Sequence, residues 1–389
     1  MRVRSFRFSA MLALAVSFTC SSSAFAEDGV SDDRILFGQA AALDGPASAL
    51  GRGMRLGILA AFEETNREGG ISGRKLELIS YDDGYEPDRS IKQTRQLIET
   101  DKVFGLIGPV GTPTSAATQP IATEAKVPFI GPFTGAGFLR NAALGNVINV
   151  RATYAAETEE WIRYLVDEQK MTRIAILYQD DAFGRVGLNG VTAALAKRKM
   201  ELVAKSTYQR NTTAVKVALL DIRKAKPDAV VMVGAYKPIS EFIKLAKSIR
   251  FEPTFVNISF VGSAALAREL GTQGEGVIVS QVVPFPWDTS IPVVRDYQAA
   301  LRAVEADAKP DFVSLEGYLV GRLTTMALRK MDSDVTRQKF LRTIWSTGTF
   351  DLGGVELTFS QDDNQGSGDV FMTRIARDGR FLPIELPLN

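Results

Sequence analysis

The sequence predicts an α/β fold of two Rossmann-like lobes with parallel central sheets, joined by a hinge that the chain crosses more than once. Strand-like and helix-like runs alternate from residue 35 to residue 149, which is typical of a parallel sheet covered by helices. The alternation starts again after residue 151, so a second lobe begins there. Helical runs left over near the C-terminus indicate that the chain returns to the first lobe.

The elements of the first lobe follow from hydrophobic patterning. Short apolar runs indicate its strands, and longer apolar-periodic runs indicate its helices. The strands are expected at residues 35–42, 75–81, 104–108 and 127–131, and the helices at residues 54–68, 87–100 and from about 114 onward.

The same signals recur in the second lobe and then change character at Val283, after which three prolines interrupt the chain. Before this point, helices are expected at residues 155–167, 183–199, 214–224 and 239–250, and strands at residues 174–178, 201–208, 229–233, 254–258 and 276–281. Beyond it, helices are expected at residues 293–304, 314–331 and 335–345, and strands at residues 355–359 and 370–375. We expect lobe 1 to comprise residues 27–149 plus 283–359, and lobe 2 residues 150–282 plus 360–389.

The N-terminus has the pattern of a secretory signal peptide. Three arginines precede an apolar run over about residues 8–18, and Ala24-Phe25-Ala26 places small residues where a signal peptidase cleaves. We expect residues 1–26 to be removed and the mature chain to be soluble and exported to the periplasm. A lipid anchor on Cys20 is a disfavoured alternative, because Ser17-Phe18-Thr19 lacks the small residue expected before such a cysteine.

Composition excludes several classes of function. The chain has no histidine and its one cysteine lies in the signal peptide, so the mature chain cannot use Ser/His/Asp or Cys/His catalysis or the usual zinc ligands. We expect no cofactor and no bound metal, although an oxygen-only Ca²⁺ or Mg²⁺ site remains open. Without the three signal-peptide arginines, 46 basic residues become 43 against 45 acidic ones, a net charge of −2 that gives no indication of nucleic-acid binding.

Two buried strands end in turns of small residues, at residues 109–113 and 132–137. The first turn leads into a helix with Thr112 or Thr114 near its N-cap, and a helix N-terminus attracts anions. The second turn is rich in glycine, so a ligand can lie against its main chain. Together the turns predict a carboxylate clamp of exposed backbone donors, although each turn alone is better explained as ordinary punctuation of an α/β fold.

A glycine pattern after the first strand offers an alternative. The run Gly51-x-Gly53-x-x-x-Gly57 faintly resembles a dinucleotide-binding turn, and Asp82-Asp83 could imitate the acid that binds a ribose. However, the third glycine stands one position late, and export argues against a nicotinamide-dependent enzyme. We therefore interpret Asp82 and Asp83 as caps of the turn that follows them.

Several blocks of sequence occur in a specific order and spacing over essentially the whole mature chain. They are Gly45-Pro46, Leu50-Gly51-Arg52-Gly53, residues 66–76 (NREGGISGRKL), Tyr81-Asp82-Asp83, the two turns, residues 173–176 (RIAI) and residues 234–238 (GAYKP). With these blocks the chain resembles the type I periplasmic solute-binding proteins of ABC transporters, in the leucine/isoleucine/valine-binding (branched-chain amino-acid-binding) family. The resemblance implies a protein that is not an enzyme, with two lobes that close on a small ligand in the Venus-flytrap manner.

The resemblance also implies which residues hold the ligand. In lobe 1, turn hydroxyls and backbone N–H groups would bind its carboxylate, and the matching residues are Val110, Gly111, Thr112, Phe133, Thr134 and Gly135. Gly135 stands where many relatives have a hydroxyl residue, so Thr134 would supply that contact. In lobe 2, Tyr236 and Phe183 match aromatic residues that cover the ligand. Tyr154 could reach the cleft from the hinge side, with an ordinary core role as an equal alternative.

One departure from the family bears on the ligand. Amino-acid-binding relatives have an acidic residue at the position of Ser259, where it pairs with the ammonium group of the ligand. A buried ammonium without a carboxylate partner is costly. We therefore expect a small carboxylate with an apolar or aromatic body, unless Asp181 or Glu316 supplies the missing acid. Leu50, where relatives can have an aromatic residue, would make the pocket more aliphatic.

The resemblance predicts an extracytoplasmic solute-binding subunit that closes around an amino acid or related small carboxylate. It would deliver this ligand to the permease subunits of an ABC importer in the inner membrane. We expect a monomer, because lobe closure needs room. A ligand-sensing subunit for a membrane receptor is one alternative, and an exported hydrolase with an acid pair or Ser–Lys pair in the cleft is another. Arg151 and Glu157, near the crossing, are interpreted as a solvated pair rather than as a hinge salt bridge or as residues that contact the ligand.

Overall fold

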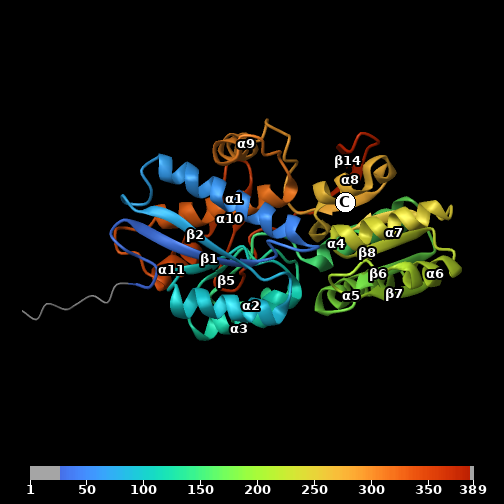
Figure 1. The fold of residues 1–389 in the computed structure, drawn as a ribbon, viewed down its shortest axis with the longest axis horizontal. Helices are drawn as coiled ribbons and strands as arrows, with labels where there is room; N and C mark the ends of the chain where they lie inside the picture. The colour runs from blue at the N-terminus through green and yellow to red at the C-terminus, as the bar shows by residue number, and fades with distance from the viewer. Residues whose placement is uncertain (1–26, 386–389) are drawn as a thin grey trace, which may run out of the picture.

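The computed structural model describes residues 27–385, which form two α/β bodies side by side (Figure 1). Each body is built on its own sheet, of five strands in one and seven in the other. We call the body with the five-stranded sheet lobe 1 and the body with the seven-stranded sheet lobe 2. The signal peptide expected from the sequence lies outside the described residues, and the residue ranges expected for the two lobes stay a prediction.

Lobe 1 has a fully parallel sheet with the strand order β2-β1-β3-β4-β5. Its strands are β1 (Arg34–Ala41), β2 (Lys75–Asp82), β3 (Gly105–Ile107), β4 (Phe129–Ile130) and β5 (Val147–Ile148). After its first residue β1 is buried throughout, as expected of a central strand covered on both faces. Strand β5 was not predicted, because two residues are too few to give a periodic signal.

The helices of lobe 1 come from both ends of the chain. They are α1 (Ser48–Arg67), α2 (Pro87–Arg95) with the π-helical turn η1 (Gln96–Thr100), α3 (Thr112–Glu124), α9 (Pro292–Val304), α10 (Phe312–Arg329) and α11 (Arg337–Thr347). Helix α1 packs along α10, although the two are separated by the whole of lobe 2 in the sequence (Figure 1). Glycines allow this close approach: a methyl group at Gly57 would lie 1.9 Å from the carbonyl oxygen of Ser314.

The start of α1 differs from the expectation. The sequence predicted a helix from residue 54, whereas the helix begins at Ser48. Two early glycines look like loop residues in the sequence, but they lie inside the helix for a packing reason. A methyl group at Gly51 would lie 2.0 Å from the carbonyl oxygen of Ala42, so only glycine lets the first turn of α1 pack against the end of β1.

Lobe 2 has a largely parallel sheet with the order β14-β13-β10-β9-β8-β6-β7. Its parallel strands are β6 (Ile174–Gln179), β7 (Ala204–Tyr208), β8 (Ala229–Val233), β9 (Thr254–Asn257) and β10 (Ile278–Gln281). The edge strands β13 (Phe371–Ile375) and β14 (Phe381–Ile384) pair antiparallel. The sheet is thus parallel at its centre, as the sequence predicted, and antiparallel at this edge, where β14 was missed.

The helices of lobe 2 are α4 (Tyr154–Ile162) with the π-helical turn η3 (Arg163–Glu168), α5 (Ala182–Lys197), α6 (Lys216–Lys224), α7 (Tyr236–Ser248) and α8 (Ser263–Leu270). Helix α8 was not predicted. It is short and begins directly after Gly262, whose φ of 79° reverses the chain. Short 3₁₀ turns are η2 (Gly137–Leu139) in lobe 1 and η4 (Ser259–Val261) and η5 (Gly271–Gly274) in lobe 2.

A separate two-stranded hairpin contains the strand expected at residues 355–359. It consists of β11 (Thr349–Asp351) and β12 (Glu356–Thr358), which pair with each other and not with either central sheet. The first of these two strands was missed.

The described chain passes between the lobes three times: after β5, after β10 and before β13. Two of these crossings pair with each other. The N–H of Asn149 donates to the carbonyl of Asn364 at 2.9 Å, and the N–H of Gly366 donates to the carbonyl of Asn149 at 2.7 Å. The hinge is thus a hydrogen-bonded structure rather than a set of independent linkers. Within residues 27–385, no helix has the length and apolar character needed to cross a bilayer.

Candidate functional site

The two small-residue turns lie side by side at the carboxyl ends of β3 and β4. Val110 forms an isolated parallel bridge with Phe133. The N–H of Gly111 donates to the carbonyl of Phe133 at 3.2 Å, and the N–H of Phe133 donates to the carbonyl of Pro109 at 2.8 Å. These backbone N–H groups therefore join the turns to each other. The remaining polar groups of interest in the turns are the threonine side chains.

Gly111 is required by the geometry of the first turn. Its φ is 106°, a region that favours glycine, and a methyl group there would lie 2.2 Å from the ring of Tyr85. Gly111 is also the N-cap of α3, and Thr112 is the first residue of the helix, so Thr112 lies near the N-cap as the sequence predicted. The hydroxyl of Thr114 donates back to the carbonyl of Gly111 at 3.0 Å.

The hydroxyls of Thr112 and Thr134 lie 2.7 Å apart and share a hydrogen bond. Both side chains are fully buried. The Thr134 hydroxyl also accepts from the N–H of Ala136 at 3.2 Å, which holds the second turn in place. The structure thus brings the hydroxyl residues of the two turns together, as a site formed by both turns requires.

Gly135 has no room for a side chain. A methyl group there would lie 2.6 Å from the backbone nitrogen of Tyr154, whose N–H donates to the carbonyl of Gly135 at 2.8 Å. The close packing of Tyr154 against the second turn therefore explains why the residue at this position is glycine.

The four site residues expected in lobe 2 each lie in the first turn of a helix. Tyr154 begins α4, Phe183 lies in the first turn of α5, Tyr236 begins α7 and Ser259 begins η4. Local caps hold two of these helices, since Thr153 accepts from the N–H of Ala156 at 3.1 Å and Asp181 accepts from the N–H of Phe183 at 2.9 Å. All four site residues are buried.

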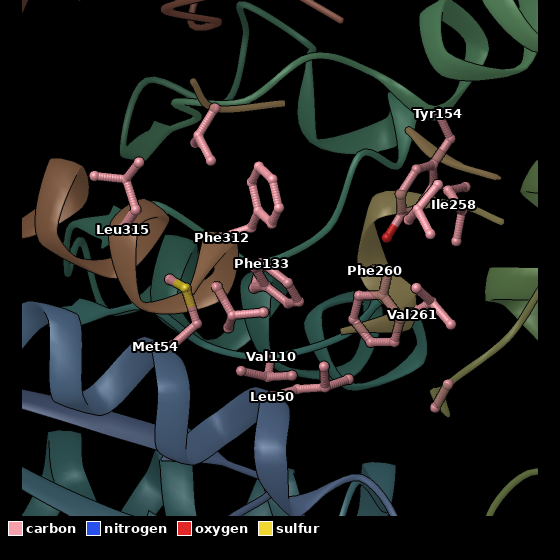
Figure 2. Close-up of a cluster of buried hydrophobic side chains, with 14 of the residues drawn as sticks. Leu50, Met54, Val110, Phe133, Tyr154, Ile258, Phe260, Val261, Phe312 and Leu315 are labelled. Atoms are coloured by element: carbon pink, nitrogen blue, oxygen red, sulfur yellow. The ribbon is translucent and has the colours of Figure 1, made fainter. Parts of the chain in front are cut away.

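Aromatic rings from both lobes gather around Phe260, a residue that the sequence analysis did not select. The ring centroid of Phe260 lies 4.6 Å from Phe183, 5.3 Å from Phe133 and 5.8 Å from Tyr85. Figure 2 shows Phe133 and Phe260 pointing toward one another from different segments, with the hydroxyl of Tyr154 directed toward them. The only sequence signal for Phe260 was its place next to Ser259. It fills the junction of the lobes with apolar surface.

Tyr236 makes a direct contact between the lobes. Its hydroxyl accepts from the backbone N–H of Ala49, in the first turn of α1, at 3.4 Å. Beside it, Leu50 lies against Gly262, where a methyl group would be 2.6 Å from the Leu50 side chain. Tyr236 and Leu50 therefore belong to the surface on which the two lobes meet.

Arg151 and Glu157 are fully buried, which corrects the interpretation of a solvated pair. A nitrogen of Arg151 lies 3.5 Å from Glu157, and another lies 3.6 Å from Glu316, which projects from α10. The exposed fractions of the three side chains are 0%, 0% and 2%. Buried charges of this kind persist only when they are paired. The signal available in the sequence was a lone arginine in the otherwise uncharged segment at the crossing.

Ser259 is bonded to an acid from another helix. Its N–H and its hydroxyl donate to the carboxylate of Glu157 at 2.9 and 2.8 Å, and it also accepts from Arg151. Ser280 donates to the same carboxylate. Of the two acids considered as substitutes, Glu316 lies beside Arg151, whereas Asp181 caps α5 and pairs with Arg210 at 2.9 Å.

Burial shifts the acidity of two carboxyl groups near the junction. Desolvation raises the pKa of Glu316 to about 7, and the negative charge of Glu157 acts in the same direction, while Arg151 opposes it. Desolvation likewise raises the pKa of Asp83 to about 6, against hydrogen bonds from Ser90 and from the N–H of Tyr85. Asp83 thus caps the turn after β2, as interpreted from the sequence.

A polar contact closes the outer side of the junction. Arg210 and Asn211, which follow β7, reach the turn after β2 in lobe 1. Arg210 pairs with Glu86 at 2.8 Å, and the Asn211 amide donates to Glu86 at 2.7 Å and to the carbonyl of Gly84 at 3.0 Å. We call these four residues the latch.

Two α/β lobes that meet at the carboxyl ends of their parallel strands, joined by several crossings, define the class of bilobal binding proteins. The sequence profile of the family described as periplasmic binding protein matches residues 35–380. The chain belongs to this family. It is therefore an extracytoplasmic solute-binding protein of the ABC transporter type and not an enzyme.

Similarity to individual proteins is modest in sequence and high in structure. The chain is 22% identical over 357 residues to Leu/Ile/Val-binding protein homolog 7 of Brucella abortus (strain 2308), covering 87% of this chain and 88% of the relative. It matches the crystal structure of a "possible leucine/isoleucine/valine-binding protein" from Rhodopirellula baltica SH 1 with a TM-score of 0.87 and 37% identity, over 93% and 98% of the chains. A fatty acid ABC transporter substrate-binding protein from Thermomonospora curvata shares the fold, with a TM-score of 0.82 and 20% identity over 92% and 93% of the chains.

Proposed function

We propose that this chain captures a small carboxylate between its lobes and delivers it to the permease subunits of an ABC importer in the inner membrane. The observation that carries the proposal is the junction itself, where Phe133 of lobe 1 packs 5.3 Å from Phe260 of lobe 2 beside buried threonine hydroxyls. Contacts shared by the two lobes exist only while the lobes are together. A ligand held by both lobes therefore favours the closed form, which the permease recognises.

The proposed class of ligand rests on how the charges at the junction are used. The carboxylate nearest Ser259 belongs to Glu157, which already accepts hydrogen bonds from Ser259 and Ser280 and forms an ion pair with Arg151. It is therefore poorly placed to pair with a ligand ammonium group, which favours a carboxylate with an apolar body against the aromatic rings. The branched-chain amino acids and fatty acids named for the relatives are also carboxylates with apolar bodies.

The proposed site consists of the residues expected from the sequence: Val110, Gly111, Thr112, Phe133, Thr134, Gly135, Tyr154, Phe183, Tyr236 and Ser259. The proposed location is the periplasm, reached with a signal peptide at residues 1–26, and the proposed working form is a monomer. These assignments are supported by the pattern of the N-terminal sequence and by the family to which the chain belongs.

A thermal-shift screen of the purified exported chain tests the function. The panel comprises amino acids, aliphatic and aromatic carboxylates, and small neutral amides, because a ligand bound only by the folded state raises the melting temperature. We expect carboxylates without an ammonium group to give the largest shifts. A response to amino acids alone would contradict the proposed ligand class while leaving solute binding intact.

A further inference from the structure

Arg151 has hydrogen-bonding capacity that the described protein does not use. Its Nη2 group donates to Ser259, but Nε and Nη1 find no hydrogen-bond acceptor among residues 27–385. The Glu316 oxygen at 3.6 Å from Nη1 is close enough for an ion pair and too far for a hydrogen bond. Unsatisfied donors on a fully buried guanidinium are unfavourable, so this group is suited to donate hydrogen bonds to a further acceptor.

The guanidinium of Arg151 lies among the residues proposed to hold the ligand. Its central carbon is 4.8 Å from the ring centroid of Phe133, in the second turn, and 5.7 Å from that of Tyr154. The hydroxyl of Tyr154 is also buried without a hydrogen-bond partner among the described residues. In Figure 2 this hydroxyl points toward the Phe133–Phe260 contact. Two unused donor groups therefore meet at the same aromatic surface.

Arg151 differs in its partners from the second arginine nearby, Arg140. Arg140 donates to the carbonyls of Thr134, Ala136 and Arg151 and to the side chain of Gln365. Its guanidinium is thus occupied by fixed backbone groups. Arg151, by contrast, forms ion pairs with the carboxylates of Glu157 and Glu316 and keeps N–H donors that have no hydrogen-bond acceptor among the described residues.

The acids beside Arg151 are not equivalent. Both oxygens of Glu157 accept hydrogen bonds from serine groups, so Glu157 is a fixed part of the protein. The Glu316 oxygen that faces Arg151 has no hydrogen-bond donor among the described residues. Burial raises the pKa of Glu316 to about 7, so the cost of desolvation weakens this carboxylate as a partner of Arg151 and makes it the easier of the two acids to replace.

We propose that Arg151 binds the carboxylate of the ligand, that the hydroxyl of Tyr154 donates to the same carboxylate, and that Glu316 is the resident counter-ion which the ligand replaces. This inference rests on the proposed function and names the residue that selects an anionic ligand. Guanidinium–carboxylate hydrogen bonds are among the strongest in proteins, particularly away from water. The apolar body of the ligand then lies against Phe133, Phe183 and Phe260.

The test compares matched acids and amides by isothermal titration calorimetry. The probes are 4-methylpentanoate and phenylacetate, their uncharged amides, and leucine with leucinamide. The main variant is the double substitution Arg151→Met/Glu316→Gln, which removes one positive and one negative charge together. Substituting Arg151 alone would leave two buried acids uncompensated and endanger folding. Arg140→Lys is the control, because it alters the neighbouring arginine without removing a charge.

We expect the wild-type chain to bind at least one acid more tightly than its amide, and the double variant to lose about 10- to 100-fold in affinity for that acid, as loss of hydrogen bonds to a charged group implies. Affinity for the matching amide should change little. Arg140→Lys should retain the preference for the acid. If the double variant does not fold, as judged by circular dichroism, Arg151→Lys provides the same comparison, because it keeps the charge and loses the planar donors.

The outcomes separate this inference from the proposed function. A double variant that still prefers the acid overturns the assignment of Arg151 and leaves carboxylate transport standing. A wild-type chain that binds only amides overturns the anionic ligand and leaves solute binding standing. A wild-type chain that binds none of the six probes overturns both the assignment of Arg151 and the proposed class of ligand. Binding of leucine that depends on Arg151 supports the assignment and shows that the ligand also carries an ammonium group.

Discussion

Single residues at the junction have identities that their neighbours in space impose. Gly135 is an example, because the backbone and ring of Tyr154 occupy the space that a side chain would need. Gly137, two positions later, has no atom within 4 Å of the place where a methyl group would be added, and its φ is not positive. The two glycines therefore differ in packing and form a natural pair for comparison.

Gly135→Ala should lower the free energy of unfolding by about 1–3 kcal/mol, the usual cost of forcing a methyl group into a packed site. Gly137→Ala should change it by less than about 0.5 kcal/mol, as is usual for surface substitutions. Urea unfolding of both variants beside the wild-type chain measures the difference. Equal stabilities for the two variants would show that the contact with Tyr154 is not constraining.

Glu316 makes stability depend on pH. Its pKa of about 7 in the folded chain exceeds the ordinary value of 4.5, so its contribution is fully present below about pH 4.5 and is lost as the pH rises through 7. The charged groups that face it are Arg151, Glu157 and Arg140. In Glu316→Gln, the fall in unfolding free energy between pH 4.5 and 7.5 should be smaller by up to ~3 kcal/mol.

Chemical denaturation at several pH values measures this effect. Asp83, with a pKa of about 6, also lowers the unfolding free energy as the pH rises. It is unchanged in the variant, so some pH dependence should remain. Parallel stability curves for the wild-type chain and Glu316→Gln would contradict the assignment of the pKa to Glu316.

The sequence could predict the parts of the site that are local in the chain. The turns with Thr112 and Thr134 follow directly from small residues after apolar strands, and the structure brings their hydroxyls to 2.7 Å. The burial of Arg151 could not be read in this way, because Ser259 and Glu316, which contact it, stand far along the chain. Charge pairs between distant segments leave no periodic signal in the sequence. The interpretation of Arg151 and Glu157 as a solvated pair was therefore wrong.

Among the elements, helix α1 was predicted only in part from the sequence pattern. Apolar runs identified most strands of both sheets, since buried parallel strands are almost continuously apolar. The first turns of α1 were missed because of their glycines, which disfavour a helix in isolation. Gly51 is there to pack against the backbone of Ala42, and Gly53 packs against the side chain of Val313. Strands of two residues, such as β5, and the edge strand β14 depend on pairing partners rather than on their own pattern.

The contact between α1 and α10 should be intolerant of even one added methyl group. Gly57→Ala would place that methyl group 1.9 Å from the backbone of α10, where no side chain can move aside. We expect the unfolding free energy to fall by roughly 3 kcal/mol or more, because the steric clash outweighs the gain of about 1 kcal/mol that alanine normally brings to a helix. Thermal unfolding is the measurement, and Arg55→Ala on the exposed face of α1 is the control. A Gly57→Ala chain as stable as the control would contradict the close packing.

For the whole molecule, the latch is the contact best placed to adjust how often the lobes are closed. It joins Glu86 of lobe 1 to Arg210 and Asn211 of lobe 2, and its side chains are partly exposed. Exposed ion pairs contribute little to folding. Because each lobe has its own core, loss of these contacts should act on the equilibrium between open and closed forms.

Asn211→Ala should weaken ligand affinity by up to roughly fivefold, equivalent to about 1 kcal/mol of lost closure energy, without lowering the melting temperature of the unliganded chain. Calorimetric affinity and small-angle scattering of the unliganded chain measure the two effects, with a larger radius of gyration expected for the variant. Arg185→Ala, which breaks an exposed pair with Asp180 inside lobe 2, is the control. An unchanged affinity and radius in Asn211→Ala would show that the latch does not influence closure.

The interleaved path of the chain has a consequence for its biogenesis. Lobe 1 needs α10 against α1, and the sheet of lobe 2 needs β13 beside β10, so each lobe incorporates segments made late in synthesis. Pairings between such distant segments form slowly, because the intervening chain must first be brought together. A nascent chain of this design stays without completed cores until almost all of it has left the ribosome. It therefore stays unfolded for longer, which is compatible with the export proposed for this chain.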